Sequence, residues 1–228
     1  MMKYILLLLF LPAFAVAQQR PTNQNLFDTI PFIPDHTTDR LAQFAKQPVE
    51  QGGIIFLGNS ITEMGNWGKL LNDTTVLNRG IGGDITFGVL KRLDDITKRR
   101  PKKLFILLGI NDIGKDIPDS VIAYNYAKII KQVHANSPAT KIFVQSILPV
   151  NPAHANFPQH YDKSEHIPRV NKMLEAGAKV LDYTYINIAP LFLDANKKLA
   201  DEYTYEGLHL KPAAYEIWVA YLKKMKYL

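Results

Sequence analysis

Ser60 and His209 stand in patterns that could support nucleophilic catalysis. Ser60 lies two residues after Gly58, which ends the apolar run 54–57. Glu206 precedes His209 by three residues, and on a tight turn its carboxylate can contact Nδ1 of the imidazole and fix the tautomer. The other ring nitrogen is then available as a general base. Serine needs such a base, because its hydroxyl is unreactive at its own pKa.

Two further segments could supply hydrogen-bond donors to a developing oxyanion. The segment 78–84 contains three glycines in four residues, which permits unusual backbone conformations and a close approach of its amides to a ligand. Asn111 follows the apolar run 104–108 and offers a side-chain amide. Donors of this kind can each contribute roughly 10²–10³ in rate. Taken singly, Ser60 and Asn111 could each merely cap the segment that follows, and serine is a favoured helix N-cap.

The elements that would position these residues alternate along the chain. Short apolar runs predict buried strands, and amphipathic stripes between them predict helices. Such an order is typical of a parallel sheet with helices on both faces, here an α/β fold with a three-layer α/β/α sandwich and five parallel strands. Ligands bind at the carboxyl ends of the strands in open sheets of this kind. The predicted strands are 54–57, 75–78, 104–108, 141–147 and 185–188, and the predicted helices are 39–46, 87–98, 118–136, 164–181 and 212–227.

Residues 1–17 are predicted to form a Sec-type signal peptide. Lys3 gives a basic n-region, 5–11 an apolar h-region, and 15–17 an A-x-A cleavage site. The apolar run is short for a bilayer, and no second long one follows. We therefore expect a bacterial periplasmic or secreted protein with no stable membrane insertion after signal removal; retention as an uncleaved anchor is the alternative. Residues 18–50 are expected to be an extended lead-in, and 51–228 a single domain.

Composition excludes several other classes of protein. The 228 residues contain no cysteine, which excludes disulfides, a lipid-modified cysteine anchor, a cysteine nucleophile and Cys-ligated zinc. The formal net charge is +6, but the basic residues are scattered and form no stripe interleaved with aromatic residues. A nucleic-acid partner is therefore not expected. The segment 78–84 also lacks the glycine patterns G-x-x-x-x-G-K-[ST] and G-x-G-x-x-G of phosphate-binding loops.

The four motifs together resemble the blocks of the SGNH hydrolases, the GDSL-type esterase and lipase family. The segments 58–62 (G-N-S-I-T), 81–84 (I-G-G-D), 109–112 (G-I-N-D) and 206–209 (E-G-L-H) resemble the family's four blocks in order. The resemblance implies a flavodoxin-like fold with Ser60 as nucleophile and His209 as base. It also implies that the oxyanion binds the N–H groups of Ser60 and Gly83 and the side chain of Asn111. No metal or organic cofactor is expected.

Two departures from the family pattern affect the candidate site differently. Asn59 replaces the usual Asp, which is not the proton acceptor, so little loss is expected. Glu206 replaces the triad Asp, and its extra methylene requires the side chain to pull back or the turn to shift. Ser-His-Glu triads occur on other folds. Asp201 as the acid, or a Ser-His dyad held by a backbone carbonyl, are the alternatives.

Other patterns around the candidate site are less specific. An α/β-hydrolase is disfavoured because position 62 is Thr where the G-x-S-x-G elbow requires Gly. His154, His160 and His166 match no zinc signature, so they are expected to be solvated loop residues rather than metal ligands. The residues expected to contact substrate are Asn59, Trp67, His160 and Tyr161, with core packing an equal alternative for Trp67.

The sequence thus predicts an extracytoplasmic serine esterase acting on a small-molecule or glycan ester. The resemblance is strongest to the branch that contains platelet-activating-factor acetylhydrolase subunits and bacterial carbohydrate or sialate O-acetylesterases. It implies removal of short acyl groups, such as acetyl from carbohydrate, through an acyl-enzyme. The alternatives are a lysophospholipase or thioesterase with a wide apolar groove, and a non-catalytic glycan-binding protein on the same fold. The natural substrate and the oligomeric state stay open.

Overall fold

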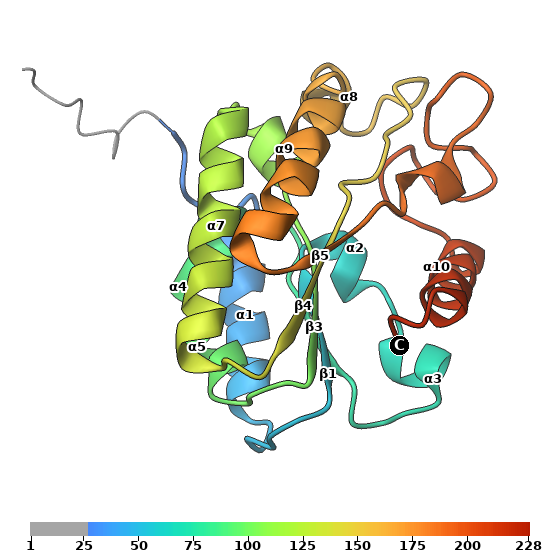
Figure 1. Cartoon of the computed structure of the whole chain (residues 1–228). Coiled ribbons are helices and arrows are strands. Elements are labelled where there is room, and N and C mark those ends of the chain that lie inside the picture. The colour runs from blue at the N-terminus through green and yellow to red at the C-terminus, as the bar shows by residue number, and fades with distance from the viewer. Residues whose placement is uncertain (1–26) are drawn as a thin grey trace, which may run out of the picture.

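A five-stranded parallel sheet forms the centre of the protein. The computed structural model describes residues 27–228, and within this part of the chain the strands lie in the order β2-β1-β3-β4-β5, every neighbouring pair being parallel. Figure 1 shows the sheet between two groups of helices. The predicted three-layer sandwich is confirmed. The strands are β1 (Ile54–Gly58), β2 (Leu77–Gly80), β3 (Lys103–Leu107), β4 (Lys141–Gln145) and β5 (Thr184–Ile186).

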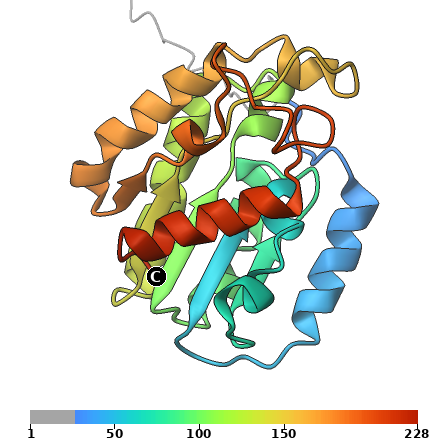
Figure 2. The ribbon, with the colours of Figure 1, turned by 90° about the vertical axis from the view of Figure 1, so that its right-hand side faces the viewer.

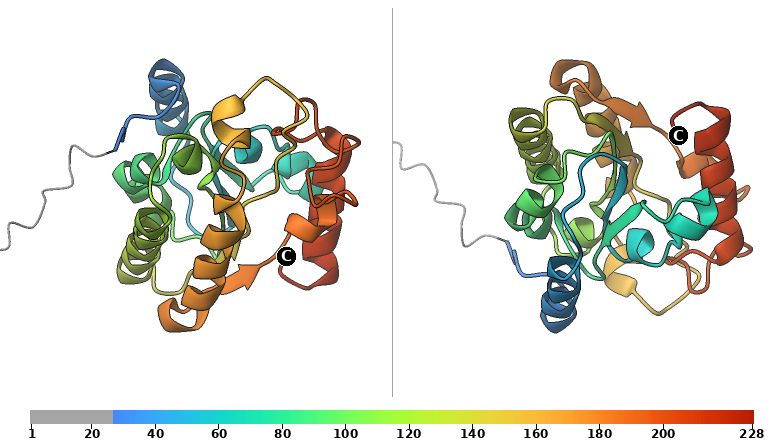
Figure 3. Two further views of the ribbon diagram at one scale, coloured as in Figure 1. Left: turned by 90° about the horizontal axis from the view of Figure 1, so that it is seen from above. Right: turned by 90° about the horizontal axis from the view of Figure 1, so that it is seen from below.

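Helices cover both faces of this sheet, as the view onto one face (Figure 2) and the views from above and below (Figure 3) show. The first face carries α4 (Thr86–Lys91), α5 (Leu93–Thr97), α7 (Asp119–Asn136) and α9 (His166–Leu181). The second face carries α3 (Trp67–Leu71), the 3₁₀ helix η2 (Ala189–Phe192) and α10 (Pro212–Lys224). The remaining helices are α1 (Pro34–Ala45), α2 (Ser60–Glu63), α6 (Ile110–Gly114) and α8 (Pro158–Tyr161).

Aromatic rings tie the central strands to the second face. Phe56, Phe105 and Phe143 stack in neighbouring strands, with ring centroids 4.8 and 4.7 Å apart. Trp67 stacks on Phe56 at 3.9 Å and meets Trp218 of α10 edge-on at 5.1 Å. Aromatic pairs of this geometry each add about 0.5–1.5 kcal/mol beyond the area that they bury. The sheet is thus a rigid base for the loops at its edge.

The strands β2, β1 and β3 end at the same level. Gly58 lies opposite Gly80 of β2 and Leu107 of β3. A Cβ at Gly58 would lie 2.1 Å from Thr62 Oγ1, and one at Gly80 would lie 2.2 Å from Glu63 N. Only glycine therefore lets α2 fold back so closely over the strand ends. The segments that carry Ser60, Gly83 and Asn111 start side by side at this edge.

The predicted helix 87–98 is wrong as a single element, because the chain forms α4 and α5 with a break at Arg92. Arg92 has φ −114° and ψ 11°, outside the helical range. Its buried guanidinium turns inward, where Nε donates to Asp84 and Nη2 donates to the Gly58 carbonyl. The other predicted elements are present with ends shifted by up to a few residues, except that the helix predicted at 39–46 begins five residues earlier, at Pro34.

The N-terminal part of the described chain packs against the sheet edge next to β2. Phe44 of α1 is buried, and the guanidinium groups of Arg40 and Arg79 lie over its ring at 4.9 and 4.5 Å. The predicted signal peptide lies outside the described residues and stays a prediction. Among residues 27–228, none of the helices combines the length and hydropathy needed to cross a bilayer.

Candidate active site

Ser60 is the first residue of α2, and Asn59 alone separates it from the end of β1. The cap of this helix is Asn59, whose side-chain Oδ1 accepts a hydrogen bond from Ile61 N at 3.0 Å. The interpretation of Ser60 as the cap is therefore wrong, and its half-buried hydroxyl is left for another partner. Asn59 itself is fully buried, so the expected substrate contact is also wrong for this residue. An amide caps as well as a carboxylate does, which explains why Asn is accommodated here.

His209 and Glu206 form a chain of hydrogen bonds with Ser60. His209 Nε2 lies 2.9 Å from Ser60 Oγ, and Nδ1 lies 2.7 Å from Glu206 Oε1. Nδ1 donates to the carboxylate, which leaves Nε2 unprotonated and able to accept the serine proton. The side chains of His209 and Glu206 are each 19% exposed, so the base can be reached from solvent. The structure thus brings together three residues that the sequence singled out.

The turn 204–209 accommodates the longer side chain of Glu206. Gly207 has φ +86°, and a Cβ there would lie 2.4 Å from the Asn151 carbonyl, so glycine is required. Glu206 Oε1 also accepts from His209 N at 2.7 Å, which folds the carboxylate back over its own turn. Thr204 Oγ1 accepts from Gly207 N and donates to His209 O. The side chain therefore pulls back, as the extra methylene requires.

The two alternatives to Glu206 are not supported by the geometry. Asp201 accepts hydrogen bonds from Asn151 Nδ2 and His154 Nε2, both at 2.9 Å, and so is engaged elsewhere. His209 Nδ1 contacts a carboxylate rather than a backbone carbonyl.

The candidate oxyanion donors lie on the loops after β1, β2 and β3. Gly83 has φ +76°, a conformation that favours glycine. Within residues 27–228, neither Ser60 N–H nor Gly83 N–H donates to an acceptor of the chain. Asn111 Nδ2 donates to the Asp84 carbonyl at 2.9 Å, and its Oδ1 accepts from His160 Nε2 at 3.0 Å. One N–H of the Asn111 amide is left over, so the three loops offer three donors.

Two buried carboxylates, Asp84 and Asp112, stabilise the segments that carry the candidate oxyanion donors. Asp84 pairs with Arg92 at 2.9 Å, and Arg92 also donates to the Gly58 carbonyl. Asp112 accepts from the backbone N–H and the hydroxyl of Thr86. Burial raises the pKa of Asp84 although Arg92 opposes that rise, and burial raises the pKa of Asp112 to about 7. Asp84 and Asp112 are the last residues of the motifs 81–84 and 109–112, but neither motif indicates Arg92 or Thr86 as a partner.

A second support, which sequence reasoning missed, comes from Glu63 and the N-terminal segment. The Glu63 carboxylate accepts from Gly82 N at 2.5 Å and pairs with His36 at 2.9 Å and Arg40 at 3.1 Å. On the same loop, Gly83 O accepts from Phe32 N at 3.0 Å. The chain before β1 is therefore bonded directly to the loop that carries a candidate oxyanion donor.

The other residues expected to contact substrate are also buried, which contradicts that expectation for Trp67 in the aromatic core, whereas for Tyr161 and His160 it stays a prediction. Trp67 is in the aromatic core and donates from Nε1 to the Thr62 carbonyl at 2.8 Å. Tyr161 donates its hydroxyl hydrogen bond to the Glu206 carbonyl, which supports the turn of the triad candidate. His160 is 3% exposed and bonds Asn111.

The three loop histidines have three separate partners. His154 bonds Asp201 and His166 bonds Asp119, at 2.9 and 2.6 Å, whereas His160 bonds Asn111. The expectation of solvated histidines is therefore wrong for His160. Over the described range 27–228, His, Asp and Glu side chains do not gather in threes that could hold a metal ion.

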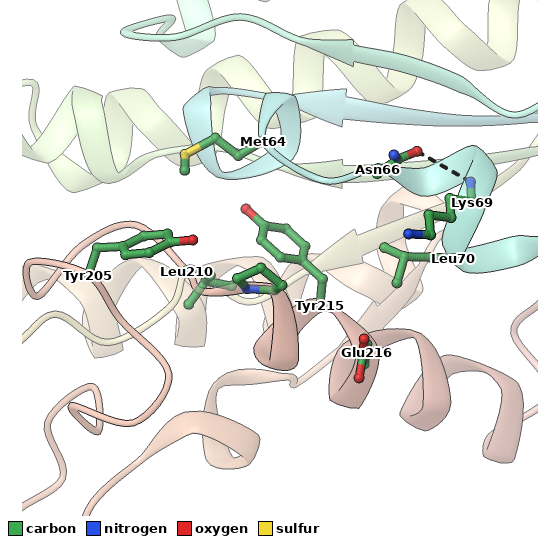
Figure 4. A pocket seen from close by; sticks show the side chains of 9 residues that line it. Met64, Asn66, Lys69, Leu70, Tyr205, Leu210, Tyr215 and Glu216 are labelled. Carbon is green, nitrogen blue, oxygen red and sulfur yellow. Dashed lines mark hydrogen bonds between the residues drawn. The ribbon is translucent and has the colours of Figure 1, made fainter.

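A cleft of about 370 Å³ lies between α3 and the start of α10, next to the C-terminal end of α2. Met64 and Tyr205 lie at one end and Lys69 and Leu70 at the other (Figure 4). Ser60 itself is not among the lining residues, but Met64 N bonds the Ser60 carbonyl at 2.9 Å and Tyr205 is adjacent to Glu206. The cleft is thus lined by neighbours of the triad candidate but by none of its three side chains.

Comparison with known proteins agrees with this fold and identifies the family. The model of the GDSL-like lipase/acylhydrolase family matches residues 56–217, and the chain belongs to this family of ester hydrolases. It is 27% identical over 183 residues to an arylesterase of Vibrio mimicus, covering 80% of this chain and 81% of that one. It is 26% identical over 170 residues to the bovine (Bos taurus) platelet-activating factor acetylhydrolase IB subunit alpha1, covering 71% and 69%.

A solved structure supports the same family. A protein from Streptococcus pneumonia, provisionally described as a platelet activating factor, superposes with a TM-score of 0.72 at 31% identity, covering 84% of this chain and 91% of that one. The family resemblance read from the four sequence blocks is confirmed.

Proposed function

We propose that the protein is a serine esterase that works through an acyl-enzyme. The observation that carries this proposal is the hydrogen-bond chain Ser60–His209–Glu206 next to the unused donors of Gly83 and Asn111. His209 takes the proton of Ser60 Oγ as the oxygen attacks the ester carbonyl. The oxyanion then accepts from Ser60 N–H, Gly83 N–H and the Asn111 amide.

The second half of the reaction uses the same groups. The tetrahedral intermediate collapses, the carbon–oxygen bond to the alcohol breaks, and His209 gives its proton to the leaving oxygen. Water then attacks the acyl-Ser60 ester with His209 again as base, and collapse of the second intermediate releases the carboxylic acid and restores Ser60. Glu206 orients the imidazole and stabilises the imidazolium form.

The proposed substrates are short-chain esters, above all O-acetyl groups on carbohydrate. The relatives named arylesterase and platelet-activating factor acetylhydrolase support ester cleavage with a small acyl group. In the cleft, the exposed ring of Tyr205 and the polar side chains of Asn66 and Lys69 offer a stacking surface and hydrogen bonds that suit a sugar.

Esters with longer acyl chains are the second candidate. The apolar lining of the cleft by Met64, Leu70 and Leu210 favours them. A panel of p-nitrophenyl esters of increasing chain length, followed by O-acetylated sialic acid and acetyl-xylan, separates the two. Turnover that rises with chain length would transfer the proposal to lysophospholipid-like or thioester substrates.

The decisive test is the nucleophile. Purified Ser60→Ala should lose turnover of p-nitrophenyl acetate by at least about a thousandfold, as for the removal of a triad member. Ser120→Ala, which truncates an exposed serine of α7, is the matched control and should keep full activity. A fluorophosphonate probe should label the wild type and fail on Ser60→Ala. Undiminished turnover by Ser60→Ala would end the proposal, and binding of glycans without hydrolysis by the wild type would favour the non-catalytic alternative.

A further inference from the structure

The side chain of Asn111 is held at both ends of its amide. Oδ1 accepts from His160 Nε2 at 3.0 Å, and Nδ2 donates to the Asp84 carbonyl at 2.9 Å. An amide turned by 180° would set its oxygen against the Asp84 carbonyl oxygen and its NH₂ group against the N–H of His160. Both contacts would be repulsive, so only one orientation is compatible with these two partners. In that orientation a single N–H remains for a ligand.

His160 is the partner whose role in this orientation depends on its tautomer. The Asp84 carbonyl can only accept, but a histidine nitrogen can accept or donate according to its tautomer. Nε2 faces an amide oxygen and therefore carries the proton. Nδ1 is buried without a hydrogen-bond partner in the described part of the chain. With the proton on Nδ1, that N–H would be buried without an acceptor and the lone pair of Nε2 would face the Asn111 oxygen. The environment therefore selects the tautomer that donates to Asn111.

Packing fixes the position of the His160 ring. The rings of Phe32 and Phe157 lie 5.4 and 5.9 Å from it, centroid to centroid. A Cβ at Gly114 would lie 3.0 Å from the imidazole, so the glycine of α6 makes room for the ring. Burial, with the charges of His209 and Lys163, lowers the pKa of His160 to about 4. The imidazole is thus neutral at pH 7 and adds no positive charge beside His209.

We propose that His160 is a positioning residue, which locks the Asn111 amide in the orientation that directs its free N–H at the oxyanion. This inference rests on the proposed function of Asn111 as an oxyanion donor. His160 does not touch substrate and does not transfer a proton in the reaction. Its effect is entirely through Asn111.

A double-mutant cycle with p-nitrophenyl acetate tests this. His160→Leu removes the donor and should lower kcat by about 10- to 100-fold, less than the roughly 10²–10³ expected for Asn111→Ala, with KM within about twofold. In the Asn111→Ala background the same substitution should change kcat by less than about twofold, because two residues that act as one unit are not additive. Rates are expressed per active site titrated with a fluorophosphonate, so that loss of folded enzyme is not counted as loss of kcat.

A conservative variant and a direct readout complete the experiment. His160→Gln places an amide N–H near the position of Nε2 and should recover most of the kcat lost in His160→Leu. Imidazole ¹⁵N shifts of the wild type should show Nε2 protonated, Nδ1 unprotonated and no titration between about pH 5.5 and 8.

The outcomes separate this inference from the proposed function. Equal losses for His160→Leu in both backgrounds, or the opposite tautomer in the ¹⁵N spectrum, would overturn the positioning role while Ser60→Ala stayed inactive. Activity in Ser60→Ala would overturn the proposed function instead. The tautomer measurement holds whether or not the enzyme turns over p-nitrophenyl acetate.

Discussion

The two halves of the candidate active site are supported in different ways. The nucleophile and base half consists of Ser60, His209 and Glu206, and the latter two lie on one short turn with side chains that are each 19% exposed. The oxyanion half consists of Gly83 and Asn111, which are both buried. Most hydrogen bonds that shape the turn of the first half lie within residues 204–209, with Tyr161 as a remote support. Contacts from other segments hold the second half.

This difference explains where the sequence can vary. At the turn, a longer acid fits because Glu206 folds back onto the His209 amide without displacing a neighbour. In the oxyanion half, Asn111 depends on His160, which is 49 residues away, and Asp84 depends on Arg92. A change there would leave another buried polar group without a partner, at about 1–3 kcal/mol.

The largest effect is expected from neutralising Glu206, the acid of the nucleophile and base half. Glu206→Gln should lower kcat by about 10⁴-fold, as removal of the charge from a triad acid does elsewhere, because an amide favours the wrong imidazole tautomer. Steady-state kinetics with p-nitrophenyl acetate measure this. Asp201→Asn is the matched control, since it neutralises the alternative acid, and it should stay within about threefold of the wild type. A larger loss in Asp201→Asn than in Glu206→Gln would show that the acid has been assigned to the wrong residue.

For the oxyanion half, we expect the buried carboxylate Asp112 to make the free energy of unfolding depend on pH. Asp112 has a pKa of about 7 in the folded protein against an ordinary value of 3.8. Between these two values the folded state binds more protons at this group than the unfolded state, so the free energy of unfolding falls as pH rises. Below about pH 4 the group is protonated in both states, and its effect vanishes. Asp112→Asn cannot ionise and keeps an oxygen for the Thr86 donors, so it should lack this loss.

Urea denaturation at pH 4.5 and pH 8 measures the effect of Asp112. Going from the lower to the higher pH, the wild type should lose about 2–4 kcal/mol relative to Asp112→Asn, since each pKa unit corresponds to about 1.4 kcal/mol. Asp94→Asn removes an exposed carboxylate of α5 and should follow the wild type. If Asp112→Asn and the wild type ran parallel across this range, the buried carboxyl would titrate normally.

The difference between local and remote contacts also explains how much of the structure the sequence could predict. The parallel sheet and the residues Ser60, His209 and Glu206 were visible because apolar runs and a three-residue spacing are local signals. The break at Arg92 was not visible, because the helical stripe continues through it and its cause is the pair of buried partners Asp84 and the Gly58 carbonyl. The role of His160 was missed for the same reason. Its partner Asn111 is remote in sequence, and a histidine in a polar segment is usually predicted to be exposed to solvent.

The smallest effect on kcat is expected where the N-terminal segment contacts the oxyanion half. Glu63 links His36 and Arg40 of α1 to Gly82 N, next to the candidate donor Gly83. In Glu63→Gln one amide oxygen can still accept from Gly82, but the ion pair with Arg40 is lost and the carboxylate contact with His36 is removed. We expect kcat to fall roughly tenfold with KM little changed, less than the roughly 10²–10³ for loss of a donor, because the loop is loosened rather than removed.

Asp39→Asn, which neutralises an exposed carboxylate of α1, controls for the change of charge on this helix and should leave kcat unaltered. A double variant tests whether Glu63 and His160 support the two proposed donors, Gly83 and Asn111, independently. Because Glu63 acts on the Gly82–Gly83 loop and His160 acts on Asn111, the effects of Glu63→Gln and His160→Leu on kcat should multiply. A double variant no slower than His160→Leu alone would mean that α1 and α8 restrain a single unit, and that the oxyanion half is one network rather than two.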